Sequence, residues 1–141
     1  MKRIFSILAL VTACLLFAPK QTYAQCDEVA DSCSAELFPF NSDGQYYRAQ
    51  LFAGETAKVR ITLYDGMVYR IMPCGRSKTG ERLDFTLYDK KGNKLFSTED
   101  VKAKEPYYDF SFGATTEYLI VAKFKSGDGC AAILVGYQEE G

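Results

Sequence analysis

Cysteine is the residue type best able to do covalent chemistry in this 141-residue chain, which has five cysteines and no histidine. Without histidine, a Ser-His-Asp triad, a Cys-His pair and a histidine metal site are all excluded. The spacing of the cysteines is not that of a zinc site. Cys14 lies in the N-terminal segment that has the pattern of a removable signal peptide, described below. The exported mature chain would keep Cys26, Cys33, Cys74 and Cys130, and an even number of cysteines in a small exported domain predicts two disulfides.

Four cysteines allow three pairings. Cys26 and Cys33 are close in sequence and are predicted to close one small loop. Cys74 ends one predicted strand and Cys130 begins another, so a bridge between them would join elements far apart in the chain. Pairing within these two couples is the arrangement that the sequence favours.

Carboxylates are the remaining candidates for catalysis, as in a glycosidase. The chain has 18 acidic residues, so some pair would lie at a suitable separation by chance. Asp109 lies between two aromatic residues, but strand alternation places its side chain outward. Asp84, Asp89 and Asn93 surround one predicted hairpin and could offer oxygens to calcium. Because Asp and Asn usually bond the local backbone of turns, we expect no metal and no cofactor. Since the side chain of Asp109 points outward, we also expect that the protein is not an enzyme.

Two pairs of adjacent tyrosines are candidates for binding a ligand or a protein partner. Tyr46-Tyr47 and Tyr107-Tyr108 lie on predicted strands, so one ring of each pair should point outward. Exposed rings on a sheet could stack on a sugar or anchor a protein partner. The favoured alternative is that these rings cover the sheet or lie under the N-terminal segment.

The first 24 residues have the pattern of a signal peptide. Lys2 and Arg3 precede an apolar run, Ile4 to Ala18, that is short for a membrane-spanning helix. Cleavage is expected after Ala24, which places the mature chain in the periplasm or outside the cell. Val11 to Cys14 also resembles a lipobox, so the alternative is a lipoprotein anchored at Cys14.

The mature chain would be acidic. Removing the leader takes away three bases and no acid, which leaves 14 bases against 18 acids and a net charge of −4. This balance gives no electrostatic basis for binding nucleic acid. After the leader, no apolar run is long enough to span a membrane.

Alternating apolar and polar residues dominate the chain after residue 44. Residues 25–44 are predicted to form a disulfide-pinned loop or short helix that ends in a turn, Asn41 to Gly44. Residues 45–141 are predicted to form one domain of antiparallel strands. Strands are expected at 45–52, 57–63, 67–74, 83–88, 94–97, 108–112, 117–125 and 130–137. Short strands at this spacing favour an all-β fold, an antiparallel β-sandwich.

Two glycine turns are predicted to close hairpins. A three-residue loop, Tyr64-Asp65-Gly66, would set Leu63 opposite Met67 in one sheet. A second loop, Lys90-Lys91-Gly92, would set Leu87 opposite Leu95. The charged stretch 98–105 is predicted to cross between two sheets.

Three segments resemble the bacterial pre-peptidase C-terminal domain. They are YRAQLFAGETAKVRITLYDGMVYRI, LDFTLYDKKGNKLFS and EYLIVAKFKSGDGCAAILVGY, and the likeness covers roughly residues 45–137. The resemblance implies a jelly-roll-like sandwich and a non-catalytic accessory role in exported bacterial proteins. Family members are usually attached to secreted hydrolases, and some bind matrix polymers or calcium. We expect no catalytic domain in this chain, which also carries cysteines that the family pattern does not require.

The sequence therefore predicts a secreted, non-catalytic binding or accessory domain, with extracellular carbohydrate or a protein as its partner. The alternative is a lipid-anchored structural or interaction component of the cell envelope. A small carboxylate hydrolase is the third hypothesis.

Overall fold

The computed structural model describes residues 24–141. Helix α2 (Ala24–Ser34) and the 3₁₀ turn η1 (Ala35–Leu37) come first, and a second 3₁₀ turn, η2 (Thr98–Asp100), follows the fifth strand. The strands are β1 (Asn41–Leu51), β2 (Thr56–Leu63), β3 (Met67–Cys74), β4 (Leu83–Tyr88), β5 (Lys94–Ser97), β6 (Tyr108–Ser111), β7 (Thr116–Phe124) and β8 (Gly129–Glu139). Cys14 and the predicted leader up to residue 23 lie outside the described residues.

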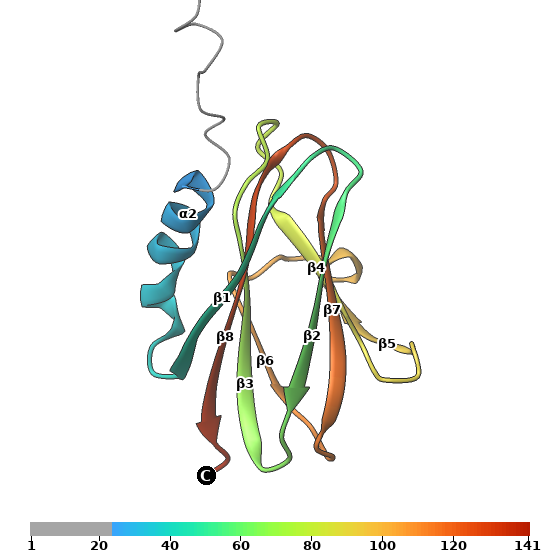
Figure 1. The fold of residues 1–141 in the computed structure, drawn as a ribbon. Coiled ribbons are helices and arrows are strands. Elements are labelled where there is room, and N and C mark those ends of the chain that lie inside the picture. Colours follow the sequence, from blue (N-terminus) through green and yellow to red (C-terminus); the bar gives the residue numbers. More distant parts are fainter. Residues whose placement is uncertain (1–23) are drawn as a thin grey trace, which may run out of the picture.

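The strands form two antiparallel sheets that pack face to face (Figure 1). Sheet A has the order β1-β8-β3-β6, and sheet B has the order β2-β7-β4-β5. This is the strand order of an eight-stranded jelly roll. The prediction of an all-β sandwich is therefore confirmed, and the segment from η2 to β6 crosses between the sheets as expected.

Period-two alternation decides which side chains enter the core. In β7, Tyr118, Ile120, Ala122 and Phe124 are buried, and the residues between them are half-buried or exposed. β2 follows the same rule, with Val59 and Leu63 buried. The inward rows of the two sheets meet in one apolar core.

Helix α2 covers the outer face of sheet A (Figure 1). Ala30 and Leu37 pack there against Met72 of β3 and Leu134 of β8. Both strands are thus buried on two faces, which explains their nearly continuous apolar sequences. The predicted turn at Asn41 to Gly44 is wrong: this segment begins β1 and carries a register shift between Ser42 and Tyr46.

The predicted hairpin between β2 and β3 is also wrong. β2 pairs with β7 in sheet B, whereas β3 pairs with β8 and β6 in sheet A. The loop that includes Gly66, at φ 78°, therefore leads from one sheet to the other. Alternation shows which face of a strand is buried. It does not show whether the next strand lies beside it or across the core.

The hairpin of β4 and β5 is confirmed, but its register differs by one residue. Leu87 lies opposite Phe96 and not Leu95, and the pairing shifts between Leu87 and Tyr88. Leu95 is 49% exposed, while Phe96 packs on Phe85 with ring centroids 5.6 Å apart. The larger ring takes the inward position because its burial removes more apolar area from water.

The expected pairing of the cysteines is wrong as well. Cys26 bonds to Cys130, and Cys33 bonds to Cys74. Cys26 and Cys33 are seven residues apart in α2, which separates their Cα atoms by about 10 Å and leaves both side chains on one face of the helix. That distance exceeds the reach of a disulfide, about 7 Å. Each cysteine therefore bonds to the sheet that the helix covers.

Candidate functional site

The four tyrosines predicted to bind are all half-buried, and the structure does not bring the two pairs together. Tyr46 and Tyr107 pack against the apolar cluster between α2 and sheet A. Tyr47 and Tyr108 pack against the core between the sheets. The first pair lies on β1, at one edge of sheet A, and the second pair lies at β6, the opposite edge. A binding role for these rings stays a prediction.

Tyr107 belongs to a cluster around the buried Arg70, which is 8% exposed. The guanidinium donates from Nε and Nη2 to the two carboxylate oxygens of Asp109, both at 2.8 Å. It lies 3.7 Å from the ring centroid of Tyr107 and 4.2 Å from that of Phe40. The bonds to Asp109 raise the pKa of Arg70 above its ordinary value.

This cluster holds the chain between η1 and β1 against sheet A. Arg70 Nη1 also donates to the carbonyl oxygen of Phe38 at 3.4 Å. Asp109 points outward as predicted. Strand alternation also sets Arg70 on the outer face of β3, opposite to that of its neighbours Tyr69 and Ile71, which face the core. That face is covered by Phe40 and Tyr107, whose positions depend on the path of the N-terminal segment.

A groove lies between the sheets along their β1 and β2 edges. Its larger hollow has a volume of about 450 Å³ and is lined by Tyr46 and Tyr47 of β1 together with alanines of four strands. A second hollow of about 250 Å³ is lined by Ile61, Met67, Tyr69 and Tyr137 among others. Inward residues of β2 and β8 line both hollows in succession, so the two hollows follow one another along these strands. We call them together the β1/β2 groove.

Small side chains explain why this side of the sandwich is hollow. Ala49, Ala57, Ala122 and Ala131, from β1, β2, β7 and β8, all line the larger hollow. The opposite side is filled by a chain of ring contacts that runs through Phe85, Phe96, Tyr108, Phe110, Phe112 and Tyr118. The aromatic residues therefore fill one side of the core, and the alanines leave space on the other.

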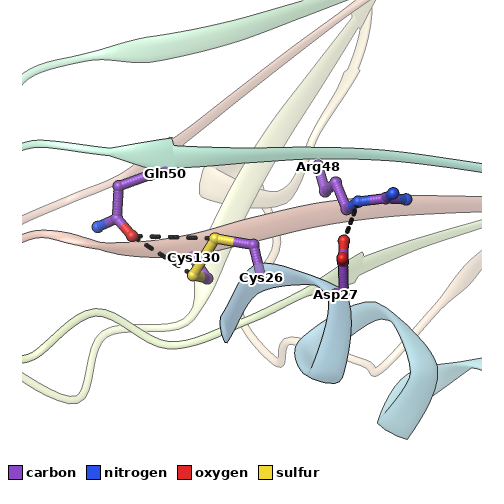
Figure 2. The surroundings of a disulfide bond; sticks show 5 residues. All are labelled: Cys26, Asp27, Arg48, Gln50 and Cys130. Carbon is purple, nitrogen blue, oxygen red and sulfur yellow. Dashed lines mark hydrogen bonds and ion pairs between the residues drawn. A yellow bond between two sulfur atoms is a disulfide. The ribbon is translucent and has the colours of Figure 1, made fainter. Parts of the chain in front are cut away.

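The described lining of the larger hollow is apolar, aromatic or cationic. Its two cations are Arg48, which is paired with Asp27 of α2 (Figure 2), and Lys58, which is exposed. Such a surface can bind by apolar contact and by attraction to an acidic group.

Figure 2 shows how the Cys26–Cys130 disulfide lies beside β1. The side-chain oxygen of Gln50 is 3.8 Å from the Cys26 sulfur and 3.5 Å from the Cys130 sulfur. Together with the Asp27–Arg48 ion pair, the disulfide ties the first turn of α2 to β1 and β8. The strands β1 and β8, whose residues line the larger hollow, are therefore held to α2 on their outer face.

The acids considered for calcium lie at opposite ends of β4. Asp84 is 2% exposed and accepts from Thr98 Oγ1 at 2.7 Å and from Lys104 Nζ at 2.5 Å. Asp89 accepts from the backbone amides of Lys91 and Asn93 at 2.9 and 2.8 Å. The side-chain amide of Asn93 also donates to Asp89 and lowers its pKa. Turn chemistry is thus confirmed for Asp89 and Asn93.

No protein-family model and no curated protein matches the sequence. Among solved structures, PliG of Aeromonas hydrophila, a periplasmic inhibitor of g-type lysozyme, is similar with a TM-score of 0.54 and 11% identity. The match covers 71% of this chain and 89% of that one. The pre-peptidase C-terminal domain of a collagenase from Bacillus anthracis matches with a TM-score of 0.46 and 14% identity, over 64% of this chain and 87% of that one.

The likeness to PliG shows a shared fold. Membership of a family stays a prediction. Within residues 24–141, the one α-helix is too short and too polar to cross a membrane.

Proposed function

We propose that this chain is an exported, non-catalytic binding domain that holds an extended segment of a protein partner in the β1/β2 groove. The observation that carries the proposal is the apolar hollow of about 450 Å³ next to the outer edge of β2. Apolar clefts of this size with a few polar groups at the rim are typical binding sites.

The edge of β2 supports a peptide as the occupant. β2 pairs with β7 over all eight of its residues without a register shift, and among the described strands it pairs with no other. One row of its backbone amide and carbonyl groups therefore has no strand partner. An added strand would bond to that row and would place every second side chain toward the groove.

The charged residues of β2 beside the groove favour a partner segment that has some acidic residues. Lys58 on β2 is exposed, and it has no carboxylate within ion-pair distance among residues 24–141. Arg60, two residues further along the same outward row, is paired with Glu117. The positive charge of Lys58, which no described carboxylate balances, would attract an acidic segment to this edge.

A protein partner is preferred to a carbohydrate. A sugar ring would need an open aromatic platform, whereas the four tyrosines pack in part against apolar clusters. The similar structure PliG is described as an inhibitor of a protein, g-type lysozyme, which makes protein the class to test first.

Export is supported by the leader pattern and by the two disulfides. Cleavage after Ala24 would give a periplasmic or secreted protein, and lipidation of Cys14 would give an anchored one. Mass spectrometry of the mature N-terminus distinguishes these outcomes. A chain that starts at Gln25 supports the first.

Selection from a phage-displayed peptide library against the mature protein tests the binding proposal. We expect enriched peptides with alternating apolar residues, and we expect Ala57→Phe, which fills the hollow, to abolish their binding. Ala53→Phe adds the same ring at an exposed position outside the groove and should leave binding intact. Peptides that bind the Ala57→Phe variant as tightly as they bind the parent would overturn the proposal. Glycan-array hits lost in Tyr46→Ala or Tyr107→Ala variants would favour carbohydrate instead.

A further inference from the structure

Two arginines face the same side of the loop between β3 and β4. Arg76 and Arg82 form an isolated antiparallel bridge, so their side chains project to one face as cross-strand neighbours. Like charges placed directly opposite one another destabilise a paired backbone. This pair therefore carries an electrostatic cost in the folded state.

Neither arginine has an acidic partner among residues 24–141. Arg76 Nη1 donates to the carbonyl oxygen of Gly80 and Arg82 Nη1 to that of Lys104, both at 3.1 Å. By contrast, Arg48, Arg60 and Arg70 are each paired with a carboxylate. The remaining N–H groups of the two guanidinium forks are thus available for an external anion.

Both arginines line a groove of about 380 Å³ on the outer side of sheet A, between α2 and the ends of β3 and β6. Its other walls include Val29, Met72, Pro73 and Pro106, together with the Cys33–Cys74 disulfide. We call this hollow the arginine groove. It is separate from the β1/β2 groove, and the inference below does not depend on that site.

The backbone beneath the arginines is fixed. Cys74 is held to α2 by its disulfide, and Gly75 follows at φ 120°. A Cβ atom at Gly75 would lie 2.0 Å from the carbonyl oxygen of Cys130, so only glycine allows this close approach. Arg76 therefore starts from a rigid position, which reduces the entropy lost on binding.

We propose that the arginine groove binds a carboxylate of a peptide segment, with its flanking side chains against the apolar walls. Paired guanidinium forks match a carboxylate through bidentate hydrogen bonds. The walls are aliphatic side chains, proline rings and a disulfide, which suit peptide side chains better than sugar rings. Glu36 also lines the groove and would repel a second negative charge, so a single carboxylate is favoured over a polyanionic polysaccharide.

A peptide array tests this proposal when each sequence is present twice, once with Glu and once with Gln at its central position. We expect the oxidised mature protein to bind the Glu members of a subset of pairs at least about tenfold more strongly, because charge-assisted bonds to two arginines are lost with Gln. The Arg76→Gln/Arg82→Gln variant should show no preference between the members of those pairs.

The Lys78→Gln/Lys102→Gln variant is the matched control. It removes two positive charges from exposed positions outside the lining of the groove and should keep the preference for Glu. Thermal unfolding should show the arginine variant to be as stable as the parent or slightly more stable, since it relieves repulsion. No preference in the parent, an equal loss in the lysine variant, or a marked loss of stability in the arginine variant would each overturn the proposal.

Discussion

The two disulfides should contribute unequally to stability because they close loops of different length. Cys26 and Cys130 are 104 residues apart, and Cys33 and Cys74 are 41 apart. The chain-entropy relation then gives about 4.7 kcal/mol for the first bridge and about 3.9 kcal/mol for the second. Each value is comparable with the whole stability of a small domain, roughly 5–15 kcal/mol.

Paired substitutions measure these contributions. Cys26→Ser/Cys130→Ser and Cys33→Ser/Cys74→Ser each remove one bridge and leave the other intact. Urea unfolding of the mature chain, followed by circular dichroism, should show both variants folded but with lower midpoints, and the first should lose more. Loss of either bridge should also release one end of α2 from sheet A, which limited proteolysis would detect.

A mixed variant tests the pairing itself. In Cys26→Ser/Cys33→Ser, the remaining Cys74 and Cys130 would have to bond between neighbouring strands. Cys74 lies opposite Ala132, so Cys130 is its diagonal neighbour at a Cα distance of about 7–8 Å, beyond the usual reach of a disulfide. This variant should contain two free thiols. A Cys74–Cys130 bridge found by non-reducing peptide mapping, in the variant or in the parent, would refute the reasoning.

Two further changes test smaller parts of the structure. Arg70→Met should lower the free energy of unfolding by about 2 kcal/mol because it breaks a partly buried ion pair. Arg60→Met, at an exposed pair, should change it by less than about 0.5 kcal/mol, and equal losses in urea unfolding would contradict this. Asp89 should titrate below the ordinary value of about 3.9, since Asn93 donates to its charged form. The turn is thus stabilised above that pH and loses the contribution as pH falls through the lowered pKa; an NMR midpoint at or above 3.9 would argue against it.

The sequence predicted the faces of the strands but not all of their neighbours. In the predicted strand 117–125, period-two alternation sets Tyr118, Ile120 and Phe124 on one face, and all three are buried, because burial of a face depends only on local pattern. The partner of β2 depends on how the chain passes between sheets, and the glycine turn after Leu63 is compatible with either path. The same limit applies to the cysteines, whose pairing required the position of α2 over sheet A.

The candidate site could be predicted only in part. Tyr46 and Tyr47 are predicted from the sequence as adjacent rings on a strand, and both line the β1/β2 groove. The hollow itself arises from alanines that are distant in sequence, and no single alanine carries a signal of its own. Arg76 and Arg82 lie opposite one another through an isolated bridge, and their spacing in the sequence carries no signal of that bridge.

The two grooves and the two disulfides are connected through sheet A. Cys130 immediately precedes Ala131, which lines the β1/β2 groove, and the Cys33–Cys74 bridge is itself a wall of the arginine groove. A hollow lined by alanine and a pair of facing arginines both lower the stability of the fold. Crosslinks worth about 4–5 kcal/mol each can offset such costs, and they do so only where thiols are oxidised. Binding at the arginine groove should therefore be lost on reduction before the sandwich unfolds, because α2 supplies one wall of that groove and the Cys33–Cys74 bridge holds it in place.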